Sequence, residues 1–215
     1  MEAVRTSEDS LEAFFRKRRR GVYIGGSITV YYPEERRFAP DLFVVNEADD
    51  HRRSAWNVLA EGRGLGFALE VHCGGDKRKD AERNVLWFAR LGIPEYFLFD
   101  ARRTVLHGWH LAEPGDRTYT RIVPQSGHWP VRSLGLEIGL WEGQPRWYDG
   151  LGMVPLTREL NYSLSLNDAL ERVQEAEAER DEATARAEAE AARATAAEAE
   201  LERLRAEIGR TRGSP

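Results

Sequence analysis

The sequence predicts a mixed α/β domain followed by a long charged helix. Strand-like and helix-like segments alternate over residues 1 to about 133, and short segments rich in Gly, Trp and Pro follow to about 160. From about Ser163 onward, Ala, Glu and Arg dominate. A chain of 215 residues has room for one domain and an appendage. We therefore expect a mixed sheet flanked by helices over residues 1–160 and a helical extension over 161–215.

The charge of the chain is unevenly distributed. Residues 161–215 contain 13 acidic and 8 basic residues, out of 36 and 31 in the whole chain, and so account for the full net charge of −5. Residues 1–160 are left with 23 of each sign. Because this part has no overall attraction for a polyanion, any contact with nucleic acid must come from a local patch.

No run of about 18 apolar residues is present, which argues against a membrane-spanning helix. The N-terminal residues show no apolar stretch behind a basic start, so we expect no secretion signal. The single cysteine, Cys73, cannot form an internal disulfide, which fits a reducing compartment. These features together predict a cytoplasmic protein.

The N-terminal elements begin with a short helix that we expect Ser10 to cap and that ends near Gly21. The five consecutive cations at 16–20 are either a solvated helix end, where positive charge suits the helix dipole, or a nucleic-acid patch. Residues 22–32 are β-branched and aromatic and predict a strand with a bend at Gly25 and Gly26.

The next elements give the sheet its predicted mixed order. We expect strands at 39–45, entered through Pro40, and at 66–72. A helix capped by Asp76 or Asp80 should run to about Leu91, where Gly92 stops it. A buried strand at 96–99 and a hairpin formed by 104–111 and 119–123 complete the set. Two strands, a helix and a further strand in this order indicate α/β architecture.

Two acids lie inside apolar strands, Asp41 and Glu70. An unpaired carboxylate in such a place is costly, and a divalent metal bound between neighbouring strands would stabilise it. Mg²⁺ prefers oxygen ligands and usually takes one or two protein carboxylates. The alternatives are structural: for Asp41, a turn or a strand-edge ion pair with an arginine such as Arg37, and for Glu70, a buried pair with an arginine.

Glu70 and His72 share a face of their strand because side chains alternate. By itself, His72 is more typical of a hydrogen-bonded sheet histidine than of a site residue. Glu95 is expected to be structural, in the connection between helix and strand. Glu12 could reach the acids from the N-terminal helix, but its pattern is that of an exposed charge.

The chain resembles the Uma-type family of putative restriction endonucleases, a branch of the PD-(D/E)XK superfamily. The resemblance covers roughly residues 10 to 150 and lies in an ordered set of segments: Ala-Pro-Asp-Leu-Phe-Val-Val at 39–45, Ala-Leu-Glu-Val at 68–71, Lys79-Asp80, and Phe-Ala-Arg-Leu-Gly-Ile-Pro-Glu-Tyr-Phe-Leu-Phe-Asp at 88–100. It implies that Asp41 and Glu70 bind Mg²⁺ or Mn²⁺, that the substrate is DNA, and that a metal-activated water cuts the phosphodiester.

The chain departs from the family pattern at one position. The resemblance implies a lysine four residues after Asp80, where this sequence has Asn84, or two residues after the strand acid, where it has His72. We hypothesise that His72 or Lys79 takes the role of that lysine. The alternative is a catalytically degenerate nuclease fold that serves as a DNA-binding or assembly module.

The C-terminal segment shows apolar residues at alternating spacings of four and three, as in a coiled coil. This seam is interrupted by Arg180 and Glu190 and ends near Gly209. Most of its members are alanine, so each heptad buries little area, and the alternatives are a single exposed helix or a docking surface for another protein. We expect a homodimer formed through this helix.

Overall fold

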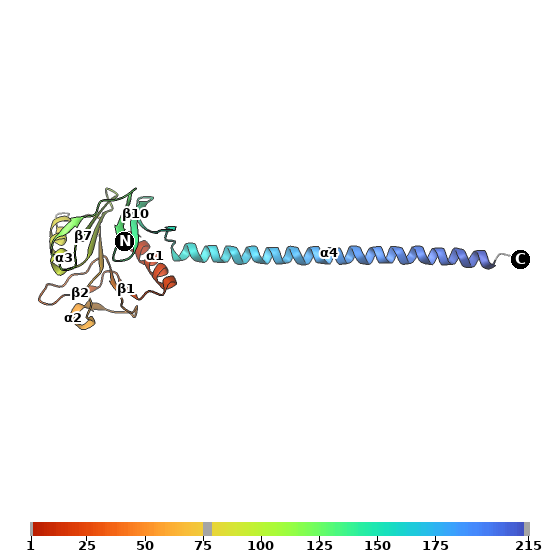
Figure 1. Cartoon of the computed structure of the whole chain (residues 1–215), viewed down its shortest axis with the longest axis horizontal. Coiled ribbons are helices and arrows are strands. Elements are labelled where there is room, and N and C mark those ends of the chain that lie inside the picture. The colour runs from red at the N-terminus through yellow and green to blue at the C-terminus, as the bar shows by residue number, and fades with distance from the viewer. Residues whose placement is uncertain (1, 75–78, 213–215) are drawn as a thin grey trace. The chain divides into compact units, whose positions relative to one another are not determined.

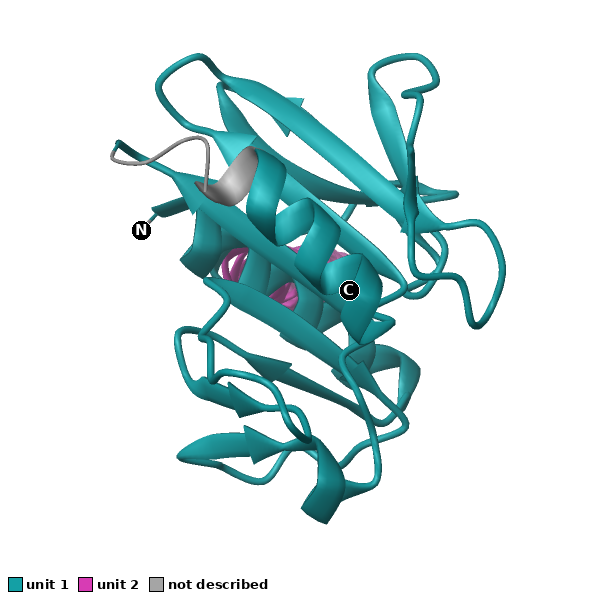
Figure 2. Ribbon diagram, turned by 90° about the vertical axis from the view of Figure 1, so that its left-hand side faces the viewer, with its two compact units in different colours: residues 1–159 teal, residues 160–215 magenta. Residues whose placement is uncertain are grey.

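A computed structural model describes residues 2–74 and 79–212. The chain divides into two compact units, residues 1–159 and 160–215, which are coloured separately in Figure 2. The first unit contains three β-sheets and three short helices, and the second belongs to one long helix (Figure 1). The predicted mixed α/β fold with a long C-terminal helix is confirmed.

The centre of the first unit is a six-stranded sheet with the order β1-β3-β5-β6-β7-β8. Only β5 and β6 are parallel, because the helical segment between them carries the chain back across the sheet. All other neighbours are antiparallel, including the predicted hairpin of β7 and β8. The strand bounds are Val22–Gly25, Leu42–Asn46, Phe67–His72, Glu95–Asp100, Val105–Leu111 and Tyr119–Arg121.

Two smaller sheets complete this unit. The segment rich in Gly, Trp and Pro forms an antiparallel sheet with the order β12-β11-β10-β9, and β2 pairs with β4 in a parallel ribbon. The bounds are β9 His128–Val131, β10 Leu136–Trp141, β11 Gln144–Asp149, β12 Gly152–Met153, β2 Thr29–Tyr31 and β4 Ala55–Asn57. The short helix α2, Val58–Glu61, follows β4, and the Asn57 side chain caps it.

The six-stranded sheet is buried on both faces, since alternate residues of its strands enter two different cores. Leu42 and Leu69 pack with residues of α1 and of the β9–β12 sheet. Phe43 and Ala68 pack instead with residues of α3, β2 and β4. This division fixes the direction of each side chain on β3 and β5, and hence of the acids at their ends.

Helix α1 runs from Glu2 to Arg18, so the prediction that Ser10 caps its start is wrong. Ser10 lies in mid-helix on the buried face, along with Ala3, Ser7 and Leu11. The buried stripe begins at Ala3 and continues through the small residues Ser7 and Ser10. This pattern of small residues is why the first two turns were missed.

The strand predicted over residues 22–32 is two strands in two sheets, β1 and β2, separated by a bend at Gly26 and Ser27. A Cβ atom on Gly26 would approach the backbone oxygen of Asp41 to 3.3 Å, so the bend is packed against the start of β3. β3 itself begins at Leu42, one residue after Asp41. The predicted strand start at residue 39 is therefore too early.

The helical segment after β5 begins with a π-helical stretch, Lys79–Asn84, and continues as α3, Val85–Leu91. Gly92 ends it in the left-handed conformation, as predicted, and its N–H group donates to the carbonyl of Ala89. Of the two predicted caps, Asp80 lies within the π-helical stretch. Asp76 lies outside the described residues.

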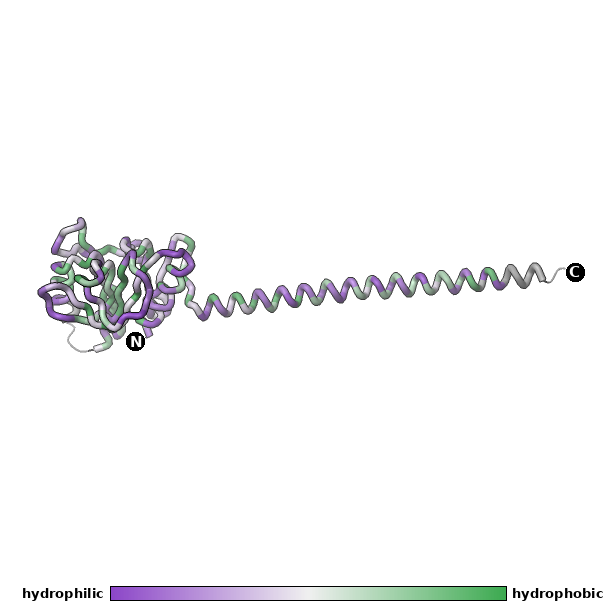
Figure 3. Tube along the Cα trace, turned by 90° about the horizontal axis from the view of Figure 1, so that it is seen from below, coloured by the Kyte–Doolittle hydropathy of each residue, from purple (hydrophilic) through white to green (hydrophobic). Residues whose placement is uncertain are grey.

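Helix α4 extends from Thr157 to Arg212, so Gly209 lies within the helix instead of ending it. Its described side chains after Leu160 are all exposed. Figure 3 shows hydrophilic and hydrophobic residues alternating along the coloured part of this helix. Among the described residues, no helix has the length and apolarity needed to cross a membrane.

Candidate functional site

Asp41 lies at the entrance to β3, between the buried Pro40 and the first paired residue of the strand. Its carboxylate oxygen Oδ2 accepts a hydrogen bond of 2.7 Å from the backbone N–H of Val71 on β5. Within the described ranges Asp41 forms no ion pair with Arg37, but it lies in a bend, which is the other structural alternative. The carboxylate is held by one oxygen, and Oδ1 is left for another ligand.

Glu70 lies on β5, the strand next to β3. The antiparallel ladder of β3 and β5 ends at the pair of Leu42 and Leu69, so Asp41 directly precedes the end of the ladder and Glu70 directly follows it. Alternation puts Glu70 on the same face of β5 as Ala68, which packs toward α3, whereas Val71 shares the face of Leu69, which packs toward α1.

A cavity of about 260 Å³ opens beside Asp41. It is formed by the N-terminal part of α1, the bend after β1 and the end of β5; its lining residues are Val4, Arg5, Glu8, Gly26, Ser27, Asp41, Val71 and Cys73. Glu8 is close to the bend, since a Cβ atom on Gly26 would lie 3.6 Å from its Oε1. The cavity thus brings a second carboxylate, from α1, to the same space as Asp41.

The sequence analysis did not single out Glu8. Burial raises the pKa of Glu8 above its usual value, repulsion from Glu12 raises it further, and Arg5 opposes both. A carboxylate that is partly removed from water beside other acids gains from any cation that enters the cavity. The available signal was its helical spacing: Glu8 lies three residues before the buried Leu11, at the margin of the buried face of α1.

The two candidates for the missing lysine lie in different surroundings. His72 is buried at the end of β5. Its backbone is in register with Asp100 of the parallel strand β6, and its carbonyl oxygen accepts a hydrogen bond from the N–H group of Ala101. The backbone of Lys79 begins the π-helical stretch, and its side chain lies outside the description. Asn84, at the position where the family pattern implies a lysine, is buried at the junction with α3.

The residues present fit a hard divalent cation. Asp41 and Glu8 line the cavity and supply oxygen donors, which Mg²⁺ and Mn²⁺ prefer, and Asp41 is already oriented by its bond to Val71; Glu70 is not among the residues that line this cavity. Over residues 2–74 and 79–212, no three His, Cys, Asp or Glu side chains converge in the geometry of a complete metal cage. A site with one or two carboxylates and water as the remaining ligands is the kind that Mg²⁺ usually takes.

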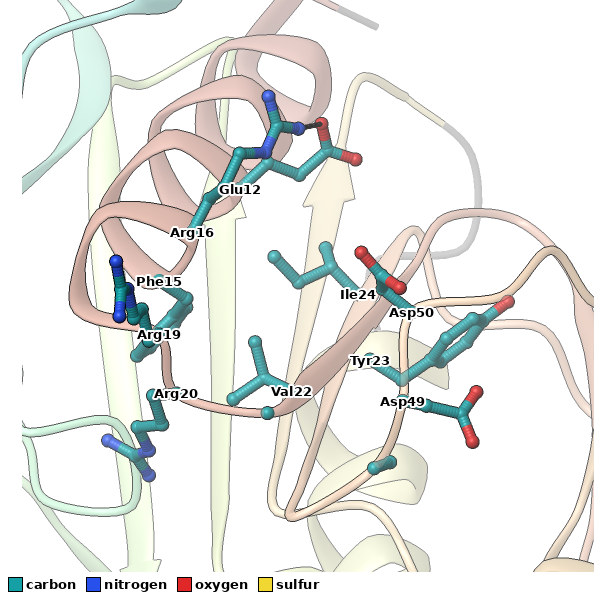
Figure 4. A pocket seen from close by; sticks show the side chains of 12 residues that line it. Glu12, Phe15, Arg16, Arg19, Arg20, Val22, Tyr23, Ile24, Asp49 and Asp50 are labelled. Atoms are coloured by element: carbon teal, nitrogen blue, oxygen red, sulfur yellow. Dashed lines mark ion pairs between the residues drawn. The ribbon is translucent and has the colours of Figure 1, made fainter.

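A larger cavity of about 510 Å³ lies elsewhere, between the end of α1 and β1 (Figure 4). Glu12, Arg16, Arg19 and Arg20 line it from α1 and the segment after it, and Asp49 and Asp50 lie on the opposite side, so its charge is mixed. Glu12 faces this cavity and pairs weakly with Arg16, at 3.9 Å. It stays an exposed charge, as expected, and does not line the cavity of Asp41.

Two of the five consecutive cations at the end of α1 serve the fold. Arg18 forms an ion pair with Asp149 at 3.0 Å. Arg20 donates to the carbonyls of Ser133 and Leu134 and to the Asn46 side chain. These contacts favour the interpretation of the run as a helix end over that of a dedicated nucleic-acid patch.

Glu95, expected to be structural, is buried at the start of β6. Its carboxylate accepts hydrogen bonds from the N–H groups of Arg132 and Ser133 and from the Ser133 hydroxyl. It therefore joins the central sheet to the turn between β9 and β10. Its oxygens are directed away from the Asp41 cavity, which does not include it among its lining residues.

Comparison with known proteins gives a family match and similarity to solved structures. The model of the family Uma2, described as "Putative restriction endonuclease", matches residues 4–147. The crystal structure of a putative nuclease belonging to DUF820 from Anabaena variabilis is similar at 13% identity, covering 62% of this chain and 72% of that one, with a TM-score of 0.45. No curated protein matches the chain. Because the family model spans about two thirds of the sequence, from α1 through β11, this chain belongs to the Uma2 family of restriction endonuclease-like proteins.

Proposed function

We propose that the domain is a metal-dependent DNA endonuclease in which Asp41 and Glu70 hold Mg²⁺ or Mn²⁺. The observation that supports the proposal is the hydrogen bond that the Asp41 carboxylate, just before β3, accepts from the N–H group of Val71, the residue that follows Glu70 on β5. Membership of the Uma2 family supports phosphodiester hydrolysis as the reaction and DNA as the substrate.

In the proposed reaction each of these residues would have a separate role. The Val71 N–H group fixes the orientation of Asp41, and the sheet fixes the position of Glu70. Glu8 adds a third acid at the cavity wall. A bound divalent ion would supply charge to polarise the phosphodiester and activate water. His72 or Lys79 would orient the attacking water and offset the developing charge.

A nicking assay on supercoiled plasmid with Mn²⁺, and without it, tests this function. We expect Asp41→Asn and Glu70→Gln each to lower the cutting rate by about 10²–10³ or more, because each removes charge at the site while keeping the side-chain shape. Glu12→Gln is the matched control, since Glu12 lines the other cavity. Equal cutting by all four proteins would exclude these acids from catalysis.

The same assay assigns the role of the missing lysine. His72→Ala and Lys79→Ala are compared separately with the parent, and the variant with the larger loss identifies the residue that acts on the water. If both variants cut as fast as the parent, neither residue has this role.

The second candidate function is a degenerate nuclease fold that binds DNA or assembles proteins without cutting. The specific observation in its favour is the buried Asn84 where the family pattern implies a cation. Calorimetry with Mn²⁺ separates the two, because an active site should bind the ion in a manner that Asp41→Asn and Glu70→Gln abolish. A domain that binds DNA but not the ion would be the degenerate form.

We further propose that α4 forms a homodimer, supported by its exposed apolar side chains. Leu166, Val173, Leu201 and Leu204 are each at least 50% exposed, which is unusual for large apolar residues spaced along one helix. Sedimentation of the full chain against a chain ending at Glu159 tests the role of the helix. If both proteins sediment with the same number of subunits, the helix has no role in dimerisation.

A further inference from the structure

The two charged residues of the α4 seam, Arg180 and Glu190, set the direction in which two copies of the helix pair. The seam has positions called a and d: a is occupied by 166, 173, 180, 187, 194 and 201, and d by 169, 176, 183, 190, 197 and 204. Arg180 is therefore at an a position and Glu190 at a d position. Both lie within the described, fully exposed part of the helix.

In a parallel pair, an a position packs against an a position and a d position against a d position. Parallel helices in register would place Arg180 against Arg180 and Glu190 against Glu190. Sliding one parallel helix by whole heptads does not bring Arg180 against Glu190, because Arg180 is at an a position and Glu190 at a d position, ten residues later. Every parallel arrangement thus leaves like or unmatched charges in the seam, where they are shielded from water.

In an antiparallel pair the second helix is reversed, so a packs against d. When the two helices cross at residue 185, Arg180 of each copy faces Glu190 of the other, and the two-fold symmetry gives two such pairs. Antiparallel registers shifted by one heptad in either direction lose both pairs. We propose that α4 forms an antiparallel homodimer centred on residue 185, an inference that rests on the dimerisation proposed above.

The apolar layers fit the same register. The layers are Leu166 with Leu204, Ala169 with Leu201, Val173 with Ala197, Ala176 with Ala194, and Ala183 with Ala187, so each of these apolar residues meets another apolar residue. Two of the five layers join a large residue to an alanine. A parallel pair also joins apolar residues, such as Leu201 with Leu201 and Ala197 with Ala197, so the apolar layers agree with the antiparallel register and the charged residues decide the direction.

The charges that flank the seam do not decide the direction. The antiparallel register brings Arg172 near Glu200 and Glu179 near Arg193, but also Arg186 near its own copy. A parallel pair has favourable flanking pairs too: Arg172 with Glu177, Arg193 with Glu198, and Glu200 with Arg205. Exposed pairs of this kind contribute little, whereas charges in the seam lose much of their hydration, so the seam decides.

Arg180 is not without a partner in the single helix, where its guanidinium bonds to Asp181 at 3.0 Å. Both side chains of that pair are more than 70% exposed, so the contact is a weak one that a partner helix can replace. With 1.5 Å of rise per residue, an antiparallel dimer centred on 185 puts the first turns of its two helices about 75 Å apart. A parallel dimer puts them side by side.

Disulfide trapping in the full chain distinguishes the two directions. In a Cys73→Ser background, Leu166→Cys and Leu204→Cys are made as two separate proteins and oxidised alone and after mixing. We expect an interchain disulfide only in the mixture, because residue 166 of one copy faces residue 204 of the other. A disulfide formed within either single variant would establish parallel helices and overturn the proposal.

A charge exchange gives an independent measurement by sedimentation. Arg180→Glu should weaken the dimer at least about tenfold, and Arg180→Glu with Glu190→Arg should restore the parent affinity. A double variant as weak as the single one would contradict the pairing, and a monomeric parent would remove the dimer itself. Neither readout uses cutting of DNA, so a failure of the nuclease proposal would leave both results intact.

Discussion

Asp41 is bonded through its carboxylate to the backbone N–H of Val71, at 2.7 Å. Val71 directly follows Glu70, so this bond ties the one acid to the strand that carries the other. The contact lies at the end of the β3–β5 ladder, where backbone pairing between the two strands stops. The side chain of Asp41 thus adds one side-chain hydrogen bond beyond the last backbone pair of the ladder.

Replacing Asp41 should separate its structural and chemical roles. Asp41→Ala leaves the Val71 N–H group without its acceptor and should lower the free energy of unfolding by about 1–2 kcal/mol. Asp41→Asn keeps an oxygen acceptor and should change stability by less than half as much. Both variants should lose cutting and Mn²⁺ binding. Urea denaturation, read beside the plasmid assay, compares the two effects.

An Asp41→Asn protein that still cuts DNA at the parent rate would contradict the chemical role of Asp41. Asparagine can accept the Val71 hydrogen bond but cannot supply a negative charge. Retained cutting would therefore assign Asp41 to the fold alone.

Glu8→Gln should stabilise the domain at neutral pH while it lowers activity. The pKa of Glu8 is raised by burial and by Glu12, so the folded state binds this proton more tightly than the unfolded state. The ionised carboxylate therefore destabilises the fold once the pH rises above its ordinary value of about 4.5. Below that pH both states are protonated and the effect vanishes.

Thermal unfolding of Glu8→Gln against the parent, measured without metal from pH 4 to pH 8, checks this. We expect the difference in Tm to grow with pH over that range. Added Mn²⁺ should raise the Tm of the parent more than that of the variant, because the ion offsets the charge that Gln lacks. A variant less stable than the parent at pH 7 would show that Glu8 is held by favourable contacts instead.

The fold was largely predictable because its strands are apolar on both faces and glycine and proline mark the ends of its elements clearly. Gly92 ended α3 as expected, and the parallel pairing of β5 with β6 followed from a helix placed between two strands. The first two turns of α1 were missed because Ala3 and Ser7 carry the buried face, and periodicity is read most easily from large apolar residues. Gly209 was misread as a stop because the rest of α4 favours the helix on both sides.

The site was only partly predictable, for a physical reason. Asp41 and Glu70 stood out because a charge inside an apolar strand needs an explanation that the strand itself does not give. Glu8 did not, because an acid on an exposed-looking helix is common and only the bend at Gly26 brings it to Asp41. The role of Glu95 as the acceptor for a turn nearly forty residues away also depends on tertiary contacts.

Arg20 should matter to the stability of the fold more than its position in a run of five cations suggests. Its guanidinium reaches the carbonyls of Ser133 and Leu134 and the side chain of Asn46. We expect Arg20→Ala to cost about 2 kcal/mol in the free energy of unfolding. Arg20→Lys should recover only part of this, because a single ammonium cannot reproduce the planar fork. Lys17→Ala, on the exposed helix end, is the control and should change stability by less than about 0.5 kcal/mol.

Glu95→Ala should be the most destabilising of these substitutions. The buried carboxylate receives three hydrogen bonds, two from backbone N–H groups and one from the Ser133 hydroxyl, and alanine leaves all three donors without an acceptor. We expect a loss of about 3 kcal/mol or more in the free energy of unfolding, measured by urea denaturation, since hydrogen bonds to a charged group are the stronger ones. Glu137→Ala is the matched control. Glu137 bonds to His128 across a strand pair but is half exposed, so its replacement should cost less than about 1 kcal/mol.

Because Arg20 and Glu95 hold the same turn from two sides, the double variant should lose less stability than the sum of the two single losses. Strict additivity would show that the turn does not open as a unit.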